Sequence, residues 1–340
     1  MDKGPVFIGG PDRCGKTTMR AFLASHPNIA IPAVGSNMWT YFYGQYGDLA
    51  DKQNFERCLD DMLHYKHVAY LQPDADRVRR EFGQGEPTYA RLFSLFIIHF
   101  AEREGKPRWG VQTGLIERYA DQVLAAYPGA RIIQMVRDPR DRYEASLALW
   151  PQGKLRAGGA VARWRYSVRL AERNVDRYPG RALIVRYETM VSRPEETLHQ
   201  VCDFLGEAYD PAMLTMDGAP KFRRKISGDR DLQPDQTPVT AEYIGRYRGR
   251  VPQAEIAFIQ SHAAREMAAY QYAPDEIHFS TGQRLRYQLV DRPVNVLKMW
   301  GWITVERLQH KFPRLIGRTP GKRMIVDPNY RALRQATVKG

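Results

Sequence analysis

The chain has 340 residues, of which 43% are hydrophobic, which is enough for a substantial core in one large domain or two ordinary ones. Its formal net charge is +13, but the charge is uneven. Residues 284–340 hold 13 Lys and Arg against 3 Asp and Glu, so residues 1–283 carry only +3. The near-neutral body argues against a nucleic-acid-binding protein and sets residues 284–340 apart as a basic extension.

Cysteine content and apolar runs limit the other classes of protein. Cys14, Cys58 and Cys202 are too few and too scattered for a disulfide framework or a metal site. The chain enters an apolar run within its first residues, and no apolar stretch reaches the roughly 18 residues of a membrane-spanning helix. We therefore expect a cytoplasmic protein without a bound metal.

Short apolar runs alternate with helical stretches along the body. Buried strands are predicted over residues 5–9, 130–138 and 181–188. Helices are predicted over residues 17–26, 158–178 and 193–206. This alternation predicts an α/β three-layer fold with a mainly parallel sheet and ligands at the carboxyl ends of its strands. Residues 36–108, which are mostly helical and aromatic, are expected to form an insertion that covers the site.

A glycine-rich loop follows the first predicted strand. Residues Gly10 to Thr17 fit the phosphate-loop pattern G-x-x-x-x-G-K-[ST]. A strand that runs through glycines into a helix presents backbone N–H groups to an anion. Arg13, Lys16 and Thr18 add charge and a hydroxyl group to the same loop. The pattern predicts a phosphate site, but by itself it does not identify the nucleotide.

A second motif, "VRDPRDRYEAS", ends the strand predicted over 130–138. Arg137 lies where that strand ends, and Asp138-Pro139 turns the chain. A helix is expected to begin near Arg140 and to carry Ser146. Arginine is the better bidentate partner for a phosphate group, and the serine can donate one more hydrogen bond.

The two motifs resemble those of the sulfotransferases that use 3′-phosphoadenosine 5′-phosphosulfate (PAPS), closest in pattern to the bacterial and tyrosylprotein members. There, "G-x-x-R-S-G-T-T" binds the 5′-phosphosulfate and "V-R-[DN]-P-R-D…S" binds the 3′-phosphate. Residues 182–206 are similar to the family's "Y-E-D-L…P…FLG" block, whose tyrosine lies near the adenine. Residues 237–255 resemble the segment that closes over the nucleotide. The resemblance spans about residues 5 to 270.

This resemblance implies a three-layer fold like that of P-loop NTPases, with a sulfotransferase domain over 1–283. It implies transfer of a sulfuryl group from PAPS, without a metal, to a hydroxyl or amine of a small molecule, glycan, lipid or peptide. Lys16 and Arg13 are the expected catalytic residues. The nucleotide-binding residues that it implies are Arg13, Cys14, Gly15, Lys16, Thr17, Thr18, Arg137, Ser146, Tyr187 and Ser227.

The chain departs from the family pattern at several positions. Lys16 replaces a threonine, and Ala145 stands where the serine of the second motif is usual. Gln112 replaces a lysine that contacts the transferred group, so we expect Lys16 to supply the missing charge. The usual acidic base after "HP" is absent, and His64, His67, Asp48 and Glu117 are candidate replacements outside any motif.

Two other functions fit the same motifs. In a P-loop kinase or NTPase, Lys16 would contact the γ-phosphate of ATP, and Asp138 or Glu188 would hold magnesium. The absence of the usual lysine and acid also permits a nucleotide-binding peripheral membrane protein without turnover.

The basic extension carries two tryptophans among Leu, Val and basic residues, in "RPVNVLKMWGWITVERLQHKFPRLIGR" (292–318). This composition suits an amphipathic helix on an anionic membrane, or a helix packed on the body with solvated basic residues. Pro293, Gly301 and Pro313 are expected to limit any helix there to short pieces.

Overall fold

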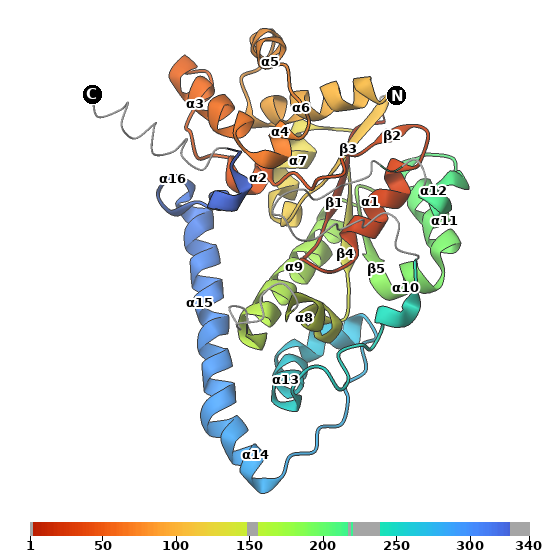
Figure 1. Ribbon diagram of the computed structural model, residues 1–340, viewed down its shortest axis with the longest axis vertical. Helices are drawn as coiled ribbons and strands as arrows, with labels where there is room; N and C mark the ends of the chain where they lie inside the picture. The colour runs from red at the N-terminus through yellow and green to blue at the C-terminus, as the bar shows by residue number, and fades with distance from the viewer. Residues whose placement is uncertain (1–2, 148–155, 217–218, 220–238, 327–340) are drawn as a thin grey trace.

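A central parallel sheet organises the computed structural model, which describes residues 3–147, 156–216, 219 and 239–326. The described residues form five strands in the order β2–β3–β1–β4–β5, with every neighbouring pair parallel (Figure 1). The strands are β1 (Val6–Gly9), β2 (Ile29–Ala30), β3 (Arg108–Gln112), β4 (Arg131–Val136) and β5 (Ala182–Arg186). Three of them, β1, β4 and β5, lie where the hydrophobic runs predicted strands.

Helices account for most of the remaining described chain. Those up to the end of β4 are α1 (Lys16–Ala24), α2 (Met38–Tyr41), α3 (Lys52–Leu63), α4 (Lys66–Ala69), α5 (Ala75–Phe82), α6 (Tyr89–Arg103), the 3₁₀-helix η1 (Ile116–Tyr119) and α7 (Ala120–Ala126). Those that follow are α8 (Pro139–Leu147), α9 (Ala157–Arg177), α10 (Tyr187–Ser192), α11 (Pro194–Leu205), α12 (Ala212–Thr215), η3 (Ala241–Tyr243), α13 (Gln253–Ala269), α14 (Thr281–Arg286), the π-helical turn η4 (Tyr287–Asp291), α15 (Arg292–Lys311), α16 (Pro313–Ile316) and η5 (Lys322–Met324).

Both faces of the sheet are buried, because successive strand side chains point to opposite faces. Val6 and Ile8 of β1 lie in the core cluster that includes α1, α10, α11 and α12. Phe7, between them, lies in the cluster that the insertion helices and α7 build on the other face. Helices therefore cover the sheet on two sides, and the predicted three-layer α/β fold is confirmed.

The sequence did not reveal β2 and β3. Strand β2 has only two residues, and β3 reads "RWGVQ", which begins with a charge and contains a glycine. The charge is compensated inside the protein, since Arg108 donates to the carboxylate of Glu207 at 3.0 Å and to the carbonyl oxygen of Gly4 at 2.7 Å. A buried charge that is paired in this way hides a strand from hydrophobic patterning.

The insertion over residues 36–108 is helical, as predicted, and contains α2 to α6. Aromatic side chains hold it together: the ring of Trp39 lies 5.0 Å from that of Tyr43 and 5.4 Å from that of Phe93. Because this aromatic cluster continues into the sheet core through Phe7, the insertion is anchored to the sheet.

The prediction of short helical pieces in the basic extension is wrong. Helix α14, the turn η4 and α15 follow one another without a break from Thr281 to Lys311, and α15 runs alongside α9 (Figure 1). Pro293 lies in the first turn of α15, where its missing N–H costs little, and directly after a widened π-turn. Within the described residues, no helix combines the length and apolar character required to cross a membrane.

The contact between α9 and α15 depends on a glycine. A Cβ atom at Gly158 would lie 1.9 Å from the carbonyl oxygen of Asn295. The N–H of Gly158 also donates to Oδ1 of Asn295 at 2.9 Å, and the Asn295 side chain is fully buried. The two helices therefore meet backbone to backbone at this position.

Gly158→Ala should lower the free energy of unfolding by about 1–3 kcal/mol, because the new methyl group overpacks this contact. Gly301→Ala, a glycine in the middle of α15 with nothing within 4 Å of an added Cβ, should instead raise it by up to about 1 kcal/mol. Chemical denaturation measures both values. Equal changes in the two variants would contradict the close contact between α9 and α15.

Candidate functional site

A cavity of about 1210 Å³ lies where the carboxyl ends of β1, β3 and β4 meet. This is the position at which parallel α/β sheets bind ligands. Three segments line the sheet side of this cavity. They are the loop after β1 (Asp12, Arg13 and Gly15–Thr18), the end of β3 (Gln112–Leu115) and the residue after β4 (Arg137). The site is thus built from both sequence motifs and from the stretch around Gln112.

The loop between β1 and α1 has a conformation that glycine permits. Gly10, Arg13 and Gly15 have φ angles of 116°, 63° and 92°. A Cβ atom at Gly10 would lie 2.4 Å from the carbonyl oxygen of Met135, and one at Gly15 would lie 2.5 Å from the ring of Tyr187. The helix α1 begins directly after Gly15 without a side-chain cap, so its first N–H groups are directed to the cavity end of the loop.

Lys16 and Cys14 take different positions in this loop. Lys16 is 7% exposed, lines the cavity, and donates from Nζ to the carbonyl oxygen of Gly10. Cys14 is fully buried and its Sγ donates to the carbonyl oxygen of Pro11 at 2.7 Å. Burial raises the pKa of the Cys14 thiol to about 11, so the thiol stays neutral at physiological pH. Of the two, Lys16 can present a charge to an anion, whereas Cys14 has only its backbone N–H to offer.

Asp12 forms an ion pair that the sequence did not reveal. Its carboxylate lies 2.6 Å from Nη1 of Arg163, a residue of α9 that also lines the cavity. Burial alone would raise the pKa of Asp12, but the charges of Arg163, Lys16 and Arg142 together hold it well below its usual range. Asp12 therefore stays ionised and fixes a second arginine beside the loop.

Arg137 connects the second motif to the first. Its guanidinium donates to the carbonyl oxygen of Arg13 at 3.1 Å and to that of Tyr243 at 2.8 Å. It also lies over the ring of Tyr187, 4.3 Å from the ring centre. Tyr187 is the first residue of α10, directly after β5, so the ends of β4 and β5 bring this stacked pair to the cavity.

Ser146 is not placed with these residues. Its side chain is buried and its Oγ donates to the carbonyl oxygen of Arg142 in the same helix, at 2.8 Å. Ala145, where the family pattern has its serine, lines the cavity instead. A contact between Ser146 and the 3′-phosphate thus remains a prediction, and Ser227 lies outside the described residues.

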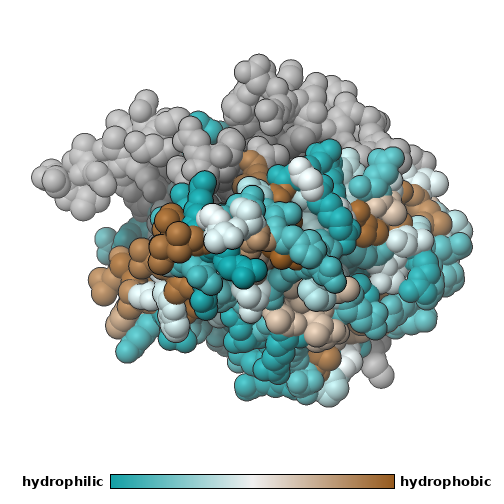
Figure 2. Space-filling model, turned by 90° about the horizontal axis from the view of Figure 1, so that it is seen from below, coloured by the Kyte–Doolittle hydropathy of each residue, from teal (hydrophilic) through white to brown (hydrophobic). Residues whose placement is uncertain are grey.

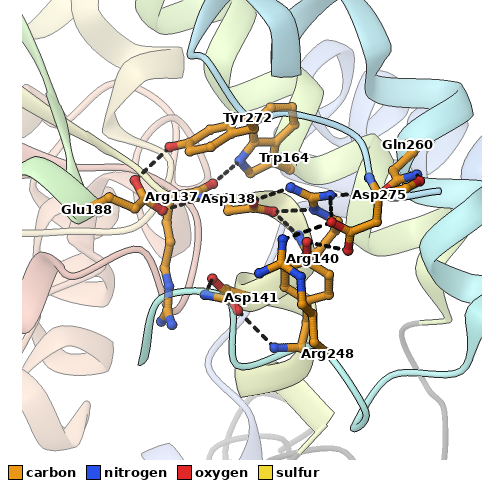
Figure 3. A network of polar contacts seen from close by, with 12 residues as sticks. Arg137, Asp138, Arg140, Asp141, Trp164, Glu188, Arg248, Gln260, Tyr272 and Asp275 are labelled. Atoms are coloured by element: carbon orange, nitrogen blue, oxygen red, sulfur yellow. Dashed lines mark hydrogen bonds and ion pairs between the residues drawn. The ribbon is translucent and has the colours of Figure 1, made fainter. Parts of the chain in front are cut away.

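The acids of the second motif take part in a network of polar contacts, which Figure 3 shows. Asp138 pairs with Arg140 at 2.7 Å, and its N–H donates to Oε1 of Glu188 at 2.9 Å. The other oxygen of Glu188 accepts from the hydroxyl of Tyr272 at 2.9 Å. Burial raises the pKa of Glu188. Both acids that a magnesium site would need are thus engaged elsewhere, and neither belongs to the cavity lining.

Asp141 attaches a distant segment to the same network. Its carboxylate accepts from the N–H of Gly245 at 2.7 Å and from that of Tyr247 at 3.0 Å. Burial raises the pKa of this carboxyl group too. The segment that it holds contributes Tyr243 and Arg246 to the cavity.

Of the four residues considered as a base, His67 lines the cavity. His64 caps α3 and bonds through Nδ1 to the carbonyl oxygen of Asp60 at 2.8 Å. Asp48 lines a separate cavity of about 810 Å³ in the insertion. Glu117 is fully buried and accepts from the hydroxyl of Ser167. His67 comes from the short helix α4, and its Nδ1 lies 2.5 Å from the carbonyl oxygen of Gly35.

Gln112 stands next to this histidine contact. Gly35 lies close to Gln112: a Cβ atom added at Gly35 would be 3.2 Å from the carbonyl oxygen of Gln112 and 3.5 Å from its Nε2. Gln112 ends β3, directly beside β1 and its loop. His67 is therefore connected through Gly35 to the position that carries a lysine in the family pattern.

The basic extension closes the remaining side of the cavity, which sequence reasoning missed. Its residues Gln309, Gly317, Arg318, Thr319 and Met324 are part of the lining. Glu306, which is 2% exposed, holds this segment by accepting from Arg118 and from Arg318. Farther along, the N–H of Val326 donates to the carbonyl oxygen of His64 at 2.8 Å. The signal in the sequence was Glu306, one of few acids in a basic segment, but no motif surrounds it.

Comparison with known proteins adds an independent line of evidence. The sequence model of the sulfotransferase family matches residues 5–211. The protein-tyrosine sulfotransferase of Drosophila melanogaster is 23% identical over 265 residues, which is 72% of this chain and 48% of the relative. Protein-tyrosine sulfotransferase 2 of Gallus gallus is 22% identical over 79% of this chain and 69% of its own length. The chain thus spans about half the length of the fly relative.

Two solved structures share the fold. The sulfotransferase domain of the Synechococcus PCC 7002 olefin synthase has a TM-score of 0.55 and 20% identity, over 79% of this chain and 95% of its own. The sulfotransferase domain from the curacin biosynthetic pathway has a TM-score of 0.52 and 17% identity, over 80% and 99% of the two chains. At this level of identity the likeness establishes the arrangement of the elements.

Proposed function

The chain belongs to the sulfotransferase family, and we propose that it transfers a sulfuryl group from PAPS to an acceptor hydroxyl or amine. The observation that carries this proposal is the convergence of the loop, Lys16 and the stacked pair of Arg137 and Tyr187 on one cavity. A P-loop kinase is the less favoured alternative, because Asp138 and Glu188 are engaged in the backbone network away from the cavity.

The cationic lining of the cavity supports the assignment of an anionic nucleotide to it. We assign the 5′-phosphosulfate to the first N–H groups of α1 with Arg13 and Lys16, because a helix N-terminus and two cations complement an anion. We assign the 3′-phosphate to Arg137 and the adenine to the neighbourhood of Tyr187. Thr17 and Thr18, which also line the cavity, add hydroxyl donors.

Lys16 and Arg13 are the proposed catalytic cations. When bound, PAPS supplies the sulfuryl group, and negative charge grows on the phosphate oxygen that it leaves. Fixed cations aimed at growing charge lower the barrier, because they need no reorganisation at the moment of reaction. Gln112 is neutral, so the loop has to provide this charge. Lys16 is already held in place there by the carbonyl oxygen of Gly10.

His67 is the proposed general base. Nδ1 of His67 contacts the carbonyl oxygen of Gly35, which can only accept, and lies 3.0 Å from the hydroxyl of Tyr65, which can accept as well as donate. A neutral ring with its proton on Nδ1 satisfies both contacts. Nε2 then has the lone pair that can take a proton from an acceptor hydroxyl. The contact with Gly35 thus favours the tautomer in which Nε2 is the basic nitrogen.

The acceptor side of the cavity is lined by Asn37, Thr40, Tyr41 and the extension residue Arg318. A small molecule, glycan, lipid or peptide hydroxyl is compatible with this polar wall. The named relatives are protein-tyrosine sulfotransferases, which makes a peptide the first acceptor to test.

Arg137→Ala should weaken binding of 3′-phosphoadenosine 5′-phosphate by about 1.5–3 kcal/mol, the scale of a lost charge-assisted hydrogen bond. The same variant should weaken the binding of adenosine 5′-phosphosulfate much less, because this nucleotide lacks the 3′-phosphate. Calorimetry measures both affinities, and Arg193→Ala, an exposed arginine paired with Glu196, should change neither. Equal losses for the two nucleotides would show that Arg137 acts through the carbonyl oxygen of Arg13 instead.

Lys16→Ala should lower kcat by about 10²-fold or more, the scale of one lost electrostatic donor, with a smaller change in nucleotide affinity. Lys16→Thr restores the usual family residue and should remain impaired unless Gln112→Lys is added. Steady-state kinetics with a common acceptor compare the three variants. Full turnover by Lys16→Thr alone would refute compensation by Lys16, and Arg13 would become the leading candidate.

His67→Asn should lower kcat by about 10²–10⁴-fold, because the amide keeps a donor for Gly35 but lacks a basic nitrogen. Its pH–rate profile should lose the acidic limb that a base produces, which a merely structural defect would not cause. His64→Asn, on the neighbouring helix outside the cavity, is the matched control. A wild-type pH profile in His67→Asn would exclude His67 as the base.

A further inference from the structure

One side of the α14–α16 segment is apolar and has no partner among the described residues. On its inner side, Asn295, Met299 and Glu306 are buried against the body. On α15, the exposed apolar side chains include Leu297 at 72%, Trp300 at 55% and Leu308 at 42%. These spacings of three and eleven residues place them on one side of the helix.

Apolar side chains are also exposed on the short helical segments α14, η4 and α16, which flank α15. Leu285 and Leu289 precede it, and Leu315 follows it, with 58%, 67% and 82% of their surfaces exposed. Figure 2, seen from the α14 end of the molecule, shows hydrophobic side chains gathered at the left edge, the side on which α15 lies in Figure 1. We call Leu285, Leu289, Leu297, Trp300, Leu308 and Leu315 the outer face. Its central part, Leu297, Trp300 and Leu308, lies on α15, a helix of 20 residues that is about 30 Å long.

The charges around the outer face have one sign. Residues 281–316 contain seven Lys and Arg against two Asp and Glu. All seven basic residues are exposed, namely Arg284, Arg286, Arg292, Lys298, Arg307, Lys311 and Arg314. Of the two acids, Glu306 is buried between Arg118 and Arg318, and Asp291 lies 3.7 Å from Arg286. The solvent side of the segment is therefore a tryptophan-containing apolar strip bordered by cations.

We propose that the outer face docks the protein on an anionic membrane surface. Apolar side chains flanked by Lys and Arg are the pattern by which a helix lies in the plane of such a surface. Tryptophan favours the level of the lipid headgroups, and cations are attracted to acidic lipids. A second copy of the chain is disfavoured as the occupant, because symmetric pairing of this face would bring the same cations together.

Docking of this kind would also orient the cavity. The helix that carries the outer face continues into Gln309 and Arg318, which line the cavity wall. The membrane and the cavity would then share one structural element, although the proposal does not depend on the reaction.

Co-sedimentation of the full chain with vesicles tests this proposal. We expect binding to vesicles of phosphatidylcholine mixed with phosphatidylserine, weakening as salt rises, and little binding to phosphatidylcholine alone. Leu297→Ser with Trp300→Ser should reduce the affinity at least tenfold. Lys298→Glu with Arg307→Glu should do the same. The control Lys52→Glu with Arg80→Glu changes the net charge equally at exposed sites of α3 and α5, and should leave most of the binding.

Three results would overturn the proposal. The first is the absence of binding to the acidic vesicles. The second is an equal loss of vesicle affinity in the control variant and in the Lys298/Arg307 variant, which would indicate attraction by net charge alone. The third is a dimer in sedimentation velocity that Trp300→Ser dissociates, which would make the face an interface between two copies. The replaced side chains are solvent-exposed, so each variant should fold like the wild type. Circular dichroism checks this.

Discussion

Repulsion among cations is the constraint around which the site is built. Arg13, Lys16, Arg137, Arg163, Arg246 and Arg318 all line the same cavity. Two like charges 4 Å apart repel by about 4 kcal/mol at the effective dielectric near a protein surface, so such a cluster needs compensation. The protein supplies it with fixed acceptors: Asp12 for Arg163, Glu306 for Arg318, Glu144 for Arg246, and carbonyl oxygens for Lys16 and Arg137. A ligand with several negative charges, such as the two phosphate-bearing ends of the proposed nucleotide, would add to this compensation.

The acids of the second motif help to hold Arg137 in place within this group of cations. Asp138 and Asp141 follow Arg137 directly but serve the backbone, where one pairs with Arg140 and the other holds the amides of Gly245 and Tyr247. They position the segment whose Tyr243 carbonyl oxygen accepts from Arg137. An arginine that is held on both sides and stacked on an aromatic ring has little freedom left to lose when it binds a phosphate.

The sequence predicted the sheet core and the loop, because both depend on local signals. Buried strands such as β1 are continuous apolar runs, and the positions of Gly10 and Gly15 require glycine. It did not predict β3, whose Arg108 is neutralised by the distant Glu207, nor the length of α15, which depends on packing against α9 through Gly158 and Asn295. Ser146 shows a further limit, since a shift of one residue in a helix turns a side chain by about 100°, and Ala145 instead of Ser146 belongs to the cavity lining. The positions of His67 and Arg318 in the cavity lining depend on tertiary contacts with Gly35 and Glu306, which no local pattern records.

The central claim is that this cavity holds a 3′-phosphorylated adenine nucleotide without a metal. Titration calorimetry of 3′-phosphoadenosine 5′-phosphate in the presence of a chelator tests it most directly, with ATP and magnesium in a parallel titration. We expect micromolar or tighter binding in the chelator, about 8 kcal/mol of binding free energy or more, and weaker binding of ATP that magnesium does not improve. Tight binding of ATP that requires magnesium, with no measurable binding of the 3′-phosphorylated nucleotide, would contradict it.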